Sequence, residues 1–503
     1  MPQSLFARLA HRFEPQSSLE RREFLKRTLA ASAGLLISGS SSFASAPPPR
    51  RGARRVIVIG GGFAGLACAH ELMSAGCRVT ILESRKRVGG RVLSMHDLVS
   101  GKTVEGGGEY IGSNHPTWVA YAHKFGLELY EGSADEDADQ PVIMDGRKLD
   151  SKETKALFEE MKIGNRRMNK DAAPVVADEP WKTPNAEALD DLNTATWLRD
   201  LPVSRTCKLA IASQLAGNNG VALSRQSYLG NLSQVKGGGL EKYWTDSEIY
   251  RCRGGNQRLA KRLAESAGEH LRLETPVTRI DTSATLAKVY CANGEVLEAD
   301  DVVLTVPPSV WSQITFEPGL PHGLHPQMGT VMKYLSVVTN RFWTNEHLGA
   351  DASTDEMISM TWDGTDGQGA GHAVLTAFSG GPAAVTSRHK WAQSKVASFQ
   401  ELLEKLYPGY AKHFVSSRFI DWSADPAARA GYSFPAPGQV TKIGPLLREG
   451  VGSLHFAGEH TCYKFVGYME GALDSGVAAA RRVLRESKVA EVDSALRFHG
   501  EYA

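Results

Sequence analysis

The sequence predicts an α/β protein of two domains, one built on a doubly wound parallel sheet and one mixed α+β, both discontinuous along the chain. Three observations predict it. The 503 residues exceed one core of ordinary size. The run Val56-Ile57-Val58-Ile59 is unbroken and apolar, as in a parallel strand buried on both faces. Glycine-rich segments of similar character stand near both ends of the chain, so distant segments should meet in one domain.

A βαβ unit follows the first strand. We expect a helix over residues 66–75 and a second strand over 78–82 that ends at Glu83. The turn between strand and helix reads Gly60-Gly61-Gly62-Phe63-Ala64-Gly65. Its glycines allow a tight turn, close approach of a pyrophosphate and packing of the helix on the sheet, while Glu83 can accept hydrogen bonds from ribose hydroxyls. The unit predicts a Rossmann-like dinucleotide site at Gly60, Gly62, Phe63, Ala64, Gly65 and Glu83.

Three further segments predict contact with a long, extended ligand. Ser84, Arg85, Gly90 and Arg91 place arginines beside a glycine pair, which suits a diphosphate. A second loop holds Gly107, Gly108, Glu109 and Tyr110. Near the C-terminus, a strand, a loop and a helix aim a further helix N-terminus at the ligand, with Gly458, Glu459, Gly467, Tyr468 and Met469 in the loop.

Together these motifs resemble the flavin-containing amine oxidase family, over roughly residues 54–486. The family signature is the GxGxxG turn, the acidic residue, and an RxGGR that here is Arg87-Val88-Gly89-Gly90-Arg91. The resemblance implies a Rossmann-like FAD-binding domain of the glutathione-reductase or amine-oxidase type, with the residues above and Val277 as FAD contacts. It also implies oxidative deamination of an amine by hydride transfer to flavin N5, with O2 as acceptor.

The resemblance also implies three catalytic residues. Lys333 lies in an apolar strand context, where a lysine in isolation would be expected to snorkel to solvent. Related oxidases place a lysine here, bonded through water to flavin N5, and burial would disfavour its charged form. Tyr432 and Tyr468 match the two tyrosines that flank the amine in monoamine oxidases. Two core tyrosines are the alternative.

Two departures from the family pattern bear on the cofactor and substrate. Covalent monoamine oxidases carry a cysteine where this chain has Gly431, so we expect noncovalent FAD. Snake-venom-type L-amino-acid oxidases carry an arginine in the glycine loop, where this chain has Glu109-Tyr110. An L-amino-acid oxidase remains an alternative, as do a C–C desaturase like protoporphyrinogen oxidase and a flavin-binding protein without catalysis.

The domain boundaries follow from these segments. We predict FAD-binding segments at 56–134, 250–315 and 443–486, and substrate-binding segments at 135–249 and 316–442. A linker at 47–55 and a tail at 487–503 flank them. The first 46 residues are predicted to be an address and not structure: Arg21-Arg22 before Phe24-Leu25-Lys26, then Ala44-Ser45-Ala46, resemble a twin-arginine (Tat) signal for export to the bacterial periplasm.

The composition of the chain indicates which kinds of binding partner to expect. The formal net charge of +1 offers no global field for nucleic acid or an anionic membrane, so a small-molecule amine or amino acid is expected, with O2 or another acceptor. Six scattered cysteines show no CxxC and no zinc spacing, which predicts neither a metal site nor a disulfide framework. We expect no stable membrane span. A homodimer is one open possibility.

Overall fold

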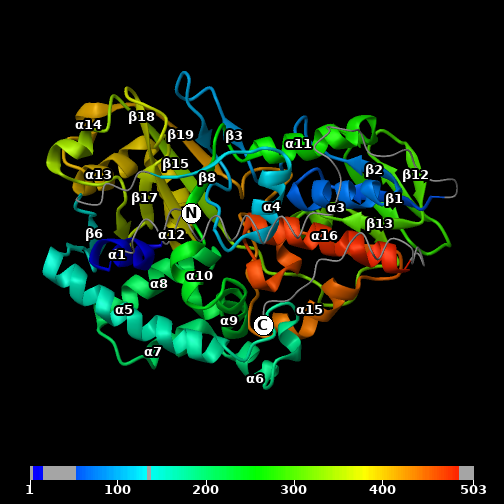
Figure 1. The fold of residues 1–503 in the computed structure, drawn as a ribbon, viewed down its shortest axis with the longest axis horizontal. Helices are drawn as coiled ribbons and strands as arrows, with labels where there is room; N and C mark the ends of the chain where they lie inside the picture. The colour runs from blue at the N-terminus through cyan, green and yellow to red at the C-terminus, as the bar shows by residue number, and fades with distance from the viewer. Residues whose placement is uncertain (1–3, 15–52, 133–137, 487–503) are drawn as a thin grey trace.

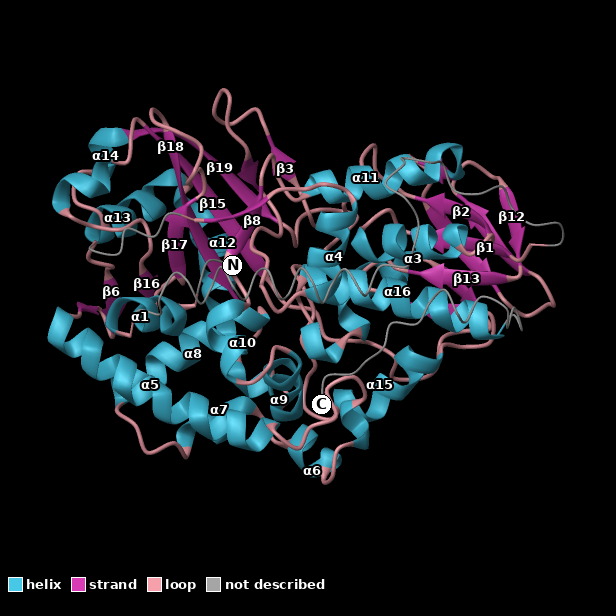
Figure 2. Ribbon diagram, in the orientation of Figure 1, coloured by secondary structure: helices cyan, strands magenta, loops and turns pink. Residues whose placement is uncertain are grey.

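The computed structural model describes residues 4–14, 53–132 and 138–486. Two sheets dominate these residues and lie at opposite ends of the molecule (Figures 1 and 2). A layer of helices runs beneath the left-hand sheet in Figure 1, and long helices pack beside the right-hand one. The α/β prediction is confirmed.

The right-hand sheet has five parallel strands and supplies the predicted βαβ unit. Its order is β20, β13, β1, β2, β9, and Val58 pairs with Val303 and Ile81 across its centre. These strands form because their apolar runs are buried on both faces. Their bounds are Leu454–Phe456, Asp301–Leu304, Arg55–Ile59, Arg78–Leu82 and Leu271–Arg272, and they pack with helices α3 (Phe63–Ser74), α11 (Gln257–Ala267) and α16 (Met469–Glu486).

The left-hand sheet has seven strands, most of them antiparallel to their neighbours. Its centre is the pair β15 and β18, in which every residue is buried. In sheet order the strands are β19 (Phe414–Asp421), β15 (Val331–Val338), β18 (Ala373–Gly380), β17 (Met360–Asp363), β16 (Ser353–Thr354), β6 (Val142–Met144) and β7 (Arg147–Lys148). Helices α12 (Pro382–Ser394), α13 (Val396–Leu406) and α14 (Tyr410–His413) lie beside it.

The helical layer lies within residues 135–249, a segment that the sequence assigned to substrate binding. Its longest helix, α5, begins with a capping box in which Asp150 and Glu153 satisfy each other's backbone N–H groups. Buried apolar side chains on its helices form one core cluster. The helices are α5 (Ser151–Ala172), α6 (Ala186–Asp191), α7 (Thr194–Arg199), α8 (Arg205–Asn219), α9 (Tyr228–Gly237) and α10 (Glu241–Asp246).

Smaller elements connect these layers. A four-stranded sheet has the order β12, β11, β10, β14, and two strand pairs are β3 with β4 and β5 with β8. Their bounds are Val296–Ala299, Ala287–Cys291, Val277–Asp281, Thr315–Glu317, Ser94–Met95, Val104–Glu105, Leu129–Glu131 and Tyr250–Cys252. The remaining α-helices are α4 (Pro116–Lys124) and α15 (Gln439–Glu449).

The strands sort by the predicted segments, although the boundaries themselves remain a prediction. Apart from Arg55, the five-stranded sheet draws on segments assigned to FAD binding, and the seven-stranded sheet draws on segments assigned to the substrate. Three boundaries cut through elements. The one after residue 55 leaves Arg55, the first residue of β1, in the predicted linker. The one at 443 falls inside α15, and the one at 315 falls inside β14, which pairs with β10 of the FAD-binding segments.

The expectation that residues 1–46 contribute no structure is wrong for residues 4–14. Helix α1 (Leu5–Phe13) packs against α5 and α10. Leu9 is fully buried, the ring of Phe6 lies 5.3 Å from that of Phe158, and the buried Arg8 guanidinium bonds to Ser353. This amphipathic helix is stabilised because its apolar face is buried against the core cluster of the helical layer. The twin arginines lie outside the described residues.

Within the described residues, no helix combines the length and apolar character that a membrane span requires. All six cysteines are buried free thiols. No cluster of His, Cys, Asp or Glu suited to a metal ion occurs in residues 4–14, 53–132 and 138–486.

Candidate active site

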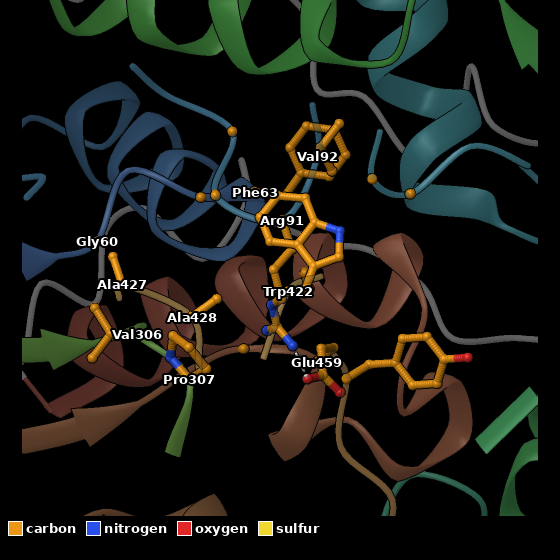
Figure 3. Close-up of a pocket in the computed structure, with 18 of the residues that line it drawn as sticks. Gly60, Phe63, Arg91, Val92, Val306, Pro307, Trp422, Ala427, Ala428 and Glu459 are labelled. Atoms are coloured by element: carbon orange, nitrogen blue, oxygen red, sulfur yellow. Dashed lines mark hydrogen bonds and ion pairs between the residues drawn. The ribbon is translucent and has the colours of Figure 1, made fainter. Parts of the chain in front are cut away.

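A cavity of about 520 Å³ joins the parallel sheet to the seven-stranded sheet. It opens at the carboxyl ends of β1 and β13, where Gly60 and Val306 stand (Figure 3). Ligands of open α/β sheets bind at this edge. From there the cavity reaches Lys333 on β15 and the tyrosines at 432 and 468. Its size and length suit an extended organic ligand.

The end of the cavity at β1 and β2 matches a nucleotide site. The Glu83 carboxylate accepts hydrogen bonds from the backbone N–H of Gly61 (2.7 Å) and of Arg85 (2.8 Å). Helix α3 starts directly after Gly62 without a side-chain cap, so its N-terminus keeps N–H groups for an anion. A Cβ on Gly90 would lie 3.4 Å from the Cα of Gly62, so two backbones face each other with no side chain between them.

An ion pair at the cavity wall joins the glycine-rich segments from the N-terminal and C-terminal parts of the chain. Arg91 donates to Glu459 (2.9 Å) and to the carbonyl of Gly431 (2.6 Å), and Figure 3 shows the two charged side chains meeting. The other Glu459 oxygen accepts from the Ser433 hydroxyl (2.6 Å) and the Gly467 N–H (2.9 Å). Burial raises the pKa of Glu459, but Arg91, His460 and the Ser433 hydroxyl together lower it by more, so that the pKa lies below its ordinary value. Glu459 is therefore a charged group that holds Arg91, Ser433 and Gly467 together at the cavity wall.

Lys333 is buried and paired with a carboxylate, so the snorkelling alternative is excluded. Its Nζ donates to Glu109 (2.8 Å) and to the carbonyl of Glu105 (3.0 Å), and it lies 5.1 Å from the ring centre of Trp362. Burial raises the pKa of Glu109, but Lys333 and Arg251 lower it below its ordinary value. The expectation that burial disfavours the charged form of Lys333 did not include this ion pair with Glu109.

Tyr432 and Tyr468 line the same cavity from two different loops. The Tyr432 hydroxyl donates to the carbonyl of Gly217 (2.7 Å), and the ring of His115 meets that of Tyr468 edge-on at 5.4 Å. Burial raises both phenol pKa values well above the ordinary value, so both rings are neutral at physiological pH. They present aromatic surface and no charge.

Comparison with known proteins decides the family. The model of the flavin containing amine oxidoreductase family matches residues 63–484, which is most of the chain. The chain belongs to this family. It is thus an FAD-dependent amine oxidoreductase, and the predicted resemblance is confirmed.

Relatives and solved structures agree with this assignment. Horse amine oxidase [flavin-containing] A is 28% identical over 464 residues, covering 86% of this chain and 85% of the relative. Human amine oxidase [flavin-containing] B is 28% identical, with 84% of each covered. Cyclohexylamine oxidase from Brevibacterium oxydans IH-35A superposes with a TM-score of 0.78 at 26% identity, covering 87% of this chain and all of that one. A putrescine oxidase triple mutant gives 0.79 at 25%, covering 86% and 99%.

The cavity of this amine oxidase gathers the predicted site residues with one exception. Gly65 packs the helix against the turn, since a Cβ there would lie 2.0 Å from the carbonyl oxygen of Gly60. The predicted residues that line the cavity are Gly60, Gly62, Phe63, Ala64, Glu83, Ser84, Arg85, Gly90, Arg91, Gly107, Gly108, Glu109, Tyr110, Val277, Lys333, Tyr432, Gly458, Glu459, Gly467, Tyr468 and Met469.

Sequence reasoning missed other parts of the lining. Val306 and Pro307 follow strand β13, and their place at the carboxyl end of a parallel strand could have indicated them. Trp422, Asn218 and Glu248 also line the cavity. These side chains come from loops and helices whose approach to the cavity depends on tertiary packing.

The residues present fit FAD. Backbone from both ends of the chain lines the cavity at glycines, as a long planar cofactor requires. A Cβ on Gly108 would lie 3.0 Å from the side chain of Met469, at the start of α16, so a larger residue here would displace that side chain. Glu83 is placed for ribose, the α3 N-terminus for diphosphate, and Lys333 with the tyrosines for the ring end.

Proposed function

We propose that this enzyme oxidises a cationic small-molecule amine to its imine, with O2 reoxidising the cofactor. The bound flavin would supply the hydride acceptor, its N5 atom. The protein would supply orientation, a water-poor cavity and fixed charges. No protein nucleophile is required for this chemistry.

The charge of the cavity is the observation that carries the proposal. In the described chain its lining holds five carboxylates and three cationic side chains, the former being Glu83, Glu109, Glu248, Asp425 and Glu459. Each cation is already paired: Arg85 with Asp425, Arg91 with Glu459 and Lys333 with Glu109. At the ring end of the cavity, Lys333 is already paired with Glu109, and Glu248 adds a further carboxyl group. A cation is therefore the charged group that this end favours.

The same pairing disfavours an L-amino-acid substrate. Such a substrate needs a cationic partner for its carboxylate, and the cavity's arginines already hold acidic side chains. Arg251 is buried beside Tyr110 and bonds to the carbonyl of Asp363, away from the cavity lining. An amine without a carboxylate suits the site better.

Each catalytic residue has a role in this proposal. Tyr432 and Tyr468 would flank the amine with their ring faces and restrict it to a reactive orientation. Lys333, held by Glu109, would place positive charge near the oxygen that is being reduced. The cyclohexylamine and putrescine that name two solved relatives are amines of the proposed class.

We further propose that the FAD is held without a covalent bond. Gly431 offers no sulfur, and a Cβ there would lie 2.4 Å from Val331 Cγ2, so a cysteine would require that side chain to move. Acid precipitation should release all of the yellow colour into the supernatant. Colour that stays with the protein pellet would overturn the noncovalent assignment.

Anaerobic flavin bleaching by a panel of amines tests the function. Primary alkylamines should bleach the flavin and release aldehyde and ammonia, while amino acids should act weakly. Bleaching by amino acids alone would favour an amino-acid oxidase, and bleaching by an apolar C–C substrate alone would favour a desaturase. A flavin that no substrate reduces would indicate a binding protein without catalysis.

Export by the Tat route is also proposed, because the twin-arginine pattern and the Ala44-Ser45-Ala46 site occur in the expected order. N-terminal sequencing of the protein from the periplasmic fraction of a bacterial host tests it. A mature chain beginning at Pro47 is expected, and the docking of α1 would then belong to the precursor, not to the exported protein. An intact chain confined to the cytoplasm would contradict export.

A further inference from the structure

Two buried acceptor groups line the cavity together with the tyrosine pair, and neither has been given a step in the chemistry described above. Glu248 follows helix α10 and is 6% exposed, and Asn218 is the next-to-last residue of helix α8 and is 8% exposed. Both line the main cavity, and both also line a small cavity behind it together with Tyr468. Asn218 and Glu248 therefore form one wall, which we call the acceptor wall.

One member of the acceptor wall, Asn218, requires a hydrogen-bond donor. Within the described residues, Asn218 Oδ1 is buried without a hydrogen-bond partner. A buried acceptor without a partner is unfavourable unless a ligand or water donates to it. A carboxyl group and an amide oxygen that line the same two cavities are groups that an ammonium, with its donors, would satisfy.

The other groups around Glu248 leave it as the proton acceptor of this wall. The titratable side chains that bear on it are the phenols of Tyr243, Tyr432 and Tyr468, and burial raises the pKa of all three. They stay protonated and compete neither as bases nor as anions. Burial raises the pKa of Glu248 itself to about 7, between its ordinary value and that of an alkylammonium, about 10.4.

We propose that the acceptor wall receives the substrate ammonium and that Glu248 takes its proton, which leaves a neutral amine between Tyr432 and Tyr468. The step balances: one N–H bond breaks, its electron pair stays on nitrogen, and one O–H bond forms on the carboxylate. Asn218 Oδ1 accepts one of the remaining N–H groups. Glu248 returns the proton to water when product leaves. The inference rests on the proposed amine oxidation.

The Glu248→Gln variant tests this assignment through the pH profile of kcat/KM. The variant keeps the shape and loses the base, so it must bind the amine already neutral. For a substrate with a pKa of about 10.4, fewer than roughly one molecule in a hundred is neutral at about pH 8. We expect kcat/KM there to fall by about 100-fold and to recover about tenfold per pH unit on raising the pH. The unmodified enzyme should vary little over that range.

Two controls separate chemistry from structure. Glu248→Asp should restore much of the unmodified profile, because it restores a base. Glu470 is a matched buried carboxyl whose pKa burial also raises to about 7, but it holds the N–H groups of Thr117 and Trp118. Glu470→Gln should keep the unmodified shape of the profile even where stability falls. Profiles of the enzyme and of Glu248→Gln that run parallel would overturn the proposal.

A binding experiment gives a readout without turnover. tert-Butylamine carries no α-hydrogen, so it can bind but cannot be oxidised. At about pH 8, its binding to the flavin-loaded enzyme should release no net proton, whereas binding to Glu248→Gln should release about one. Titration calorimetry in buffers of different ionisation enthalpy measures this. Equal proton release would overturn the role of Glu248, while failure of every amine to bleach the unmodified enzyme would instead refute the proposed function.

Discussion

The two sheets of this enzyme bind by different means. At the parallel sheet, the cavity is shaped by backbone: glycines at 60, 62, 90 and 108 line it, and a Cβ on Gly60 would lie 2.6 Å from Thr305 Oγ1. At the seven-stranded sheet it is shaped by side chains, with Lys333, Tyr432 and Glu248 converging from a strand, a loop and a helix end. The comparison teaches that the half at the parallel sheet makes room for a cofactor by omitting side chains. The other half would recognise a substrate by the side chains that it places in the cavity.

A glycine substitution gives the sharpest test of the backbone half. Gly65→Ala places a Cβ 2.0 Å from the Gly60 carbonyl, and backbone cannot move aside cheaply, so the turn that meets the diphosphate should be lost. We expect essentially no flavin absorbance in the purified variant. Gly319→Ala is the matched control, because a Cβ there meets nothing within 4 Å. Full flavin content in Gly65→Ala would break the comparison.

Helix α1 extends the side-chain half, and truncating its buried face tests that. Leu9 is fully buried when α1 is docked on its core, so Leu9→Ala should destabilise the docked helix by about 3 kcal/mol. Hydrogen exchange of the α1 amides in the full-length chain measures it. Arg12→Ala removes a partly exposed ion pair with Asp139 and should cost less than about 1 kcal/mol. Equal effects would mean that α1 is not docked in solution.

Lys333 tests whether side-chain charge serves chemistry or cofactor binding. Lys333→Met should slow reoxidation of the reduced flavin by O2 about 100-fold, as expected for loss of one catalytic group, while FAD stays bound. Stopped-flow mixing with oxygenated buffer measures the rate. Because this variant leaves Glu109 without its lysine, Lys333→Met combined with Glu109→Gln is the stability control. Unchanged oxygen kinetics would refute the assigned role.

The smallest effect is expected at a tyrosine hydroxyl. Tyr432→Phe keeps the ring and removes only the hydrogen bond to Gly217, so it should cost about 1 kcal/mol in stability and little in kcat/KM. Tyr432→Leu removes the aromatic face and should lower kcat/KM about tenfold more. Thermal unfolding and steady-state kinetics measure the two effects. A larger kinetic loss in the phenylalanine variant would mean that the hydroxyl, and not the ring face, serves the substrate.

The sequence by itself determined the cofactor half. The apolar strand at residues 56–59, the glycine turn and Glu83 predict their own structure, because strand burial, turn geometry and helix N-termini depend on neighbours in the chain. The glycine-rich segment near the C-terminus could also be recognised from the sequence alone. Lys333 and the tyrosines were found only through resemblance to a family, since a lysine on an apolar strand is otherwise ambiguous.

Tertiary structure decided the rest. The partner of Lys333 is Glu109, 224 positions earlier, and Arg91 meets Glu459 across 368 positions. Glu248 and Asn218 reach the cavity because helices α10 and α8 end close to it. Helix α1 is stabilised because its apolar face packs on a core formed by other segments of the chain. Such contacts join residues that have no local relation in the chain, and their charge states follow from burial that only the packed molecule creates.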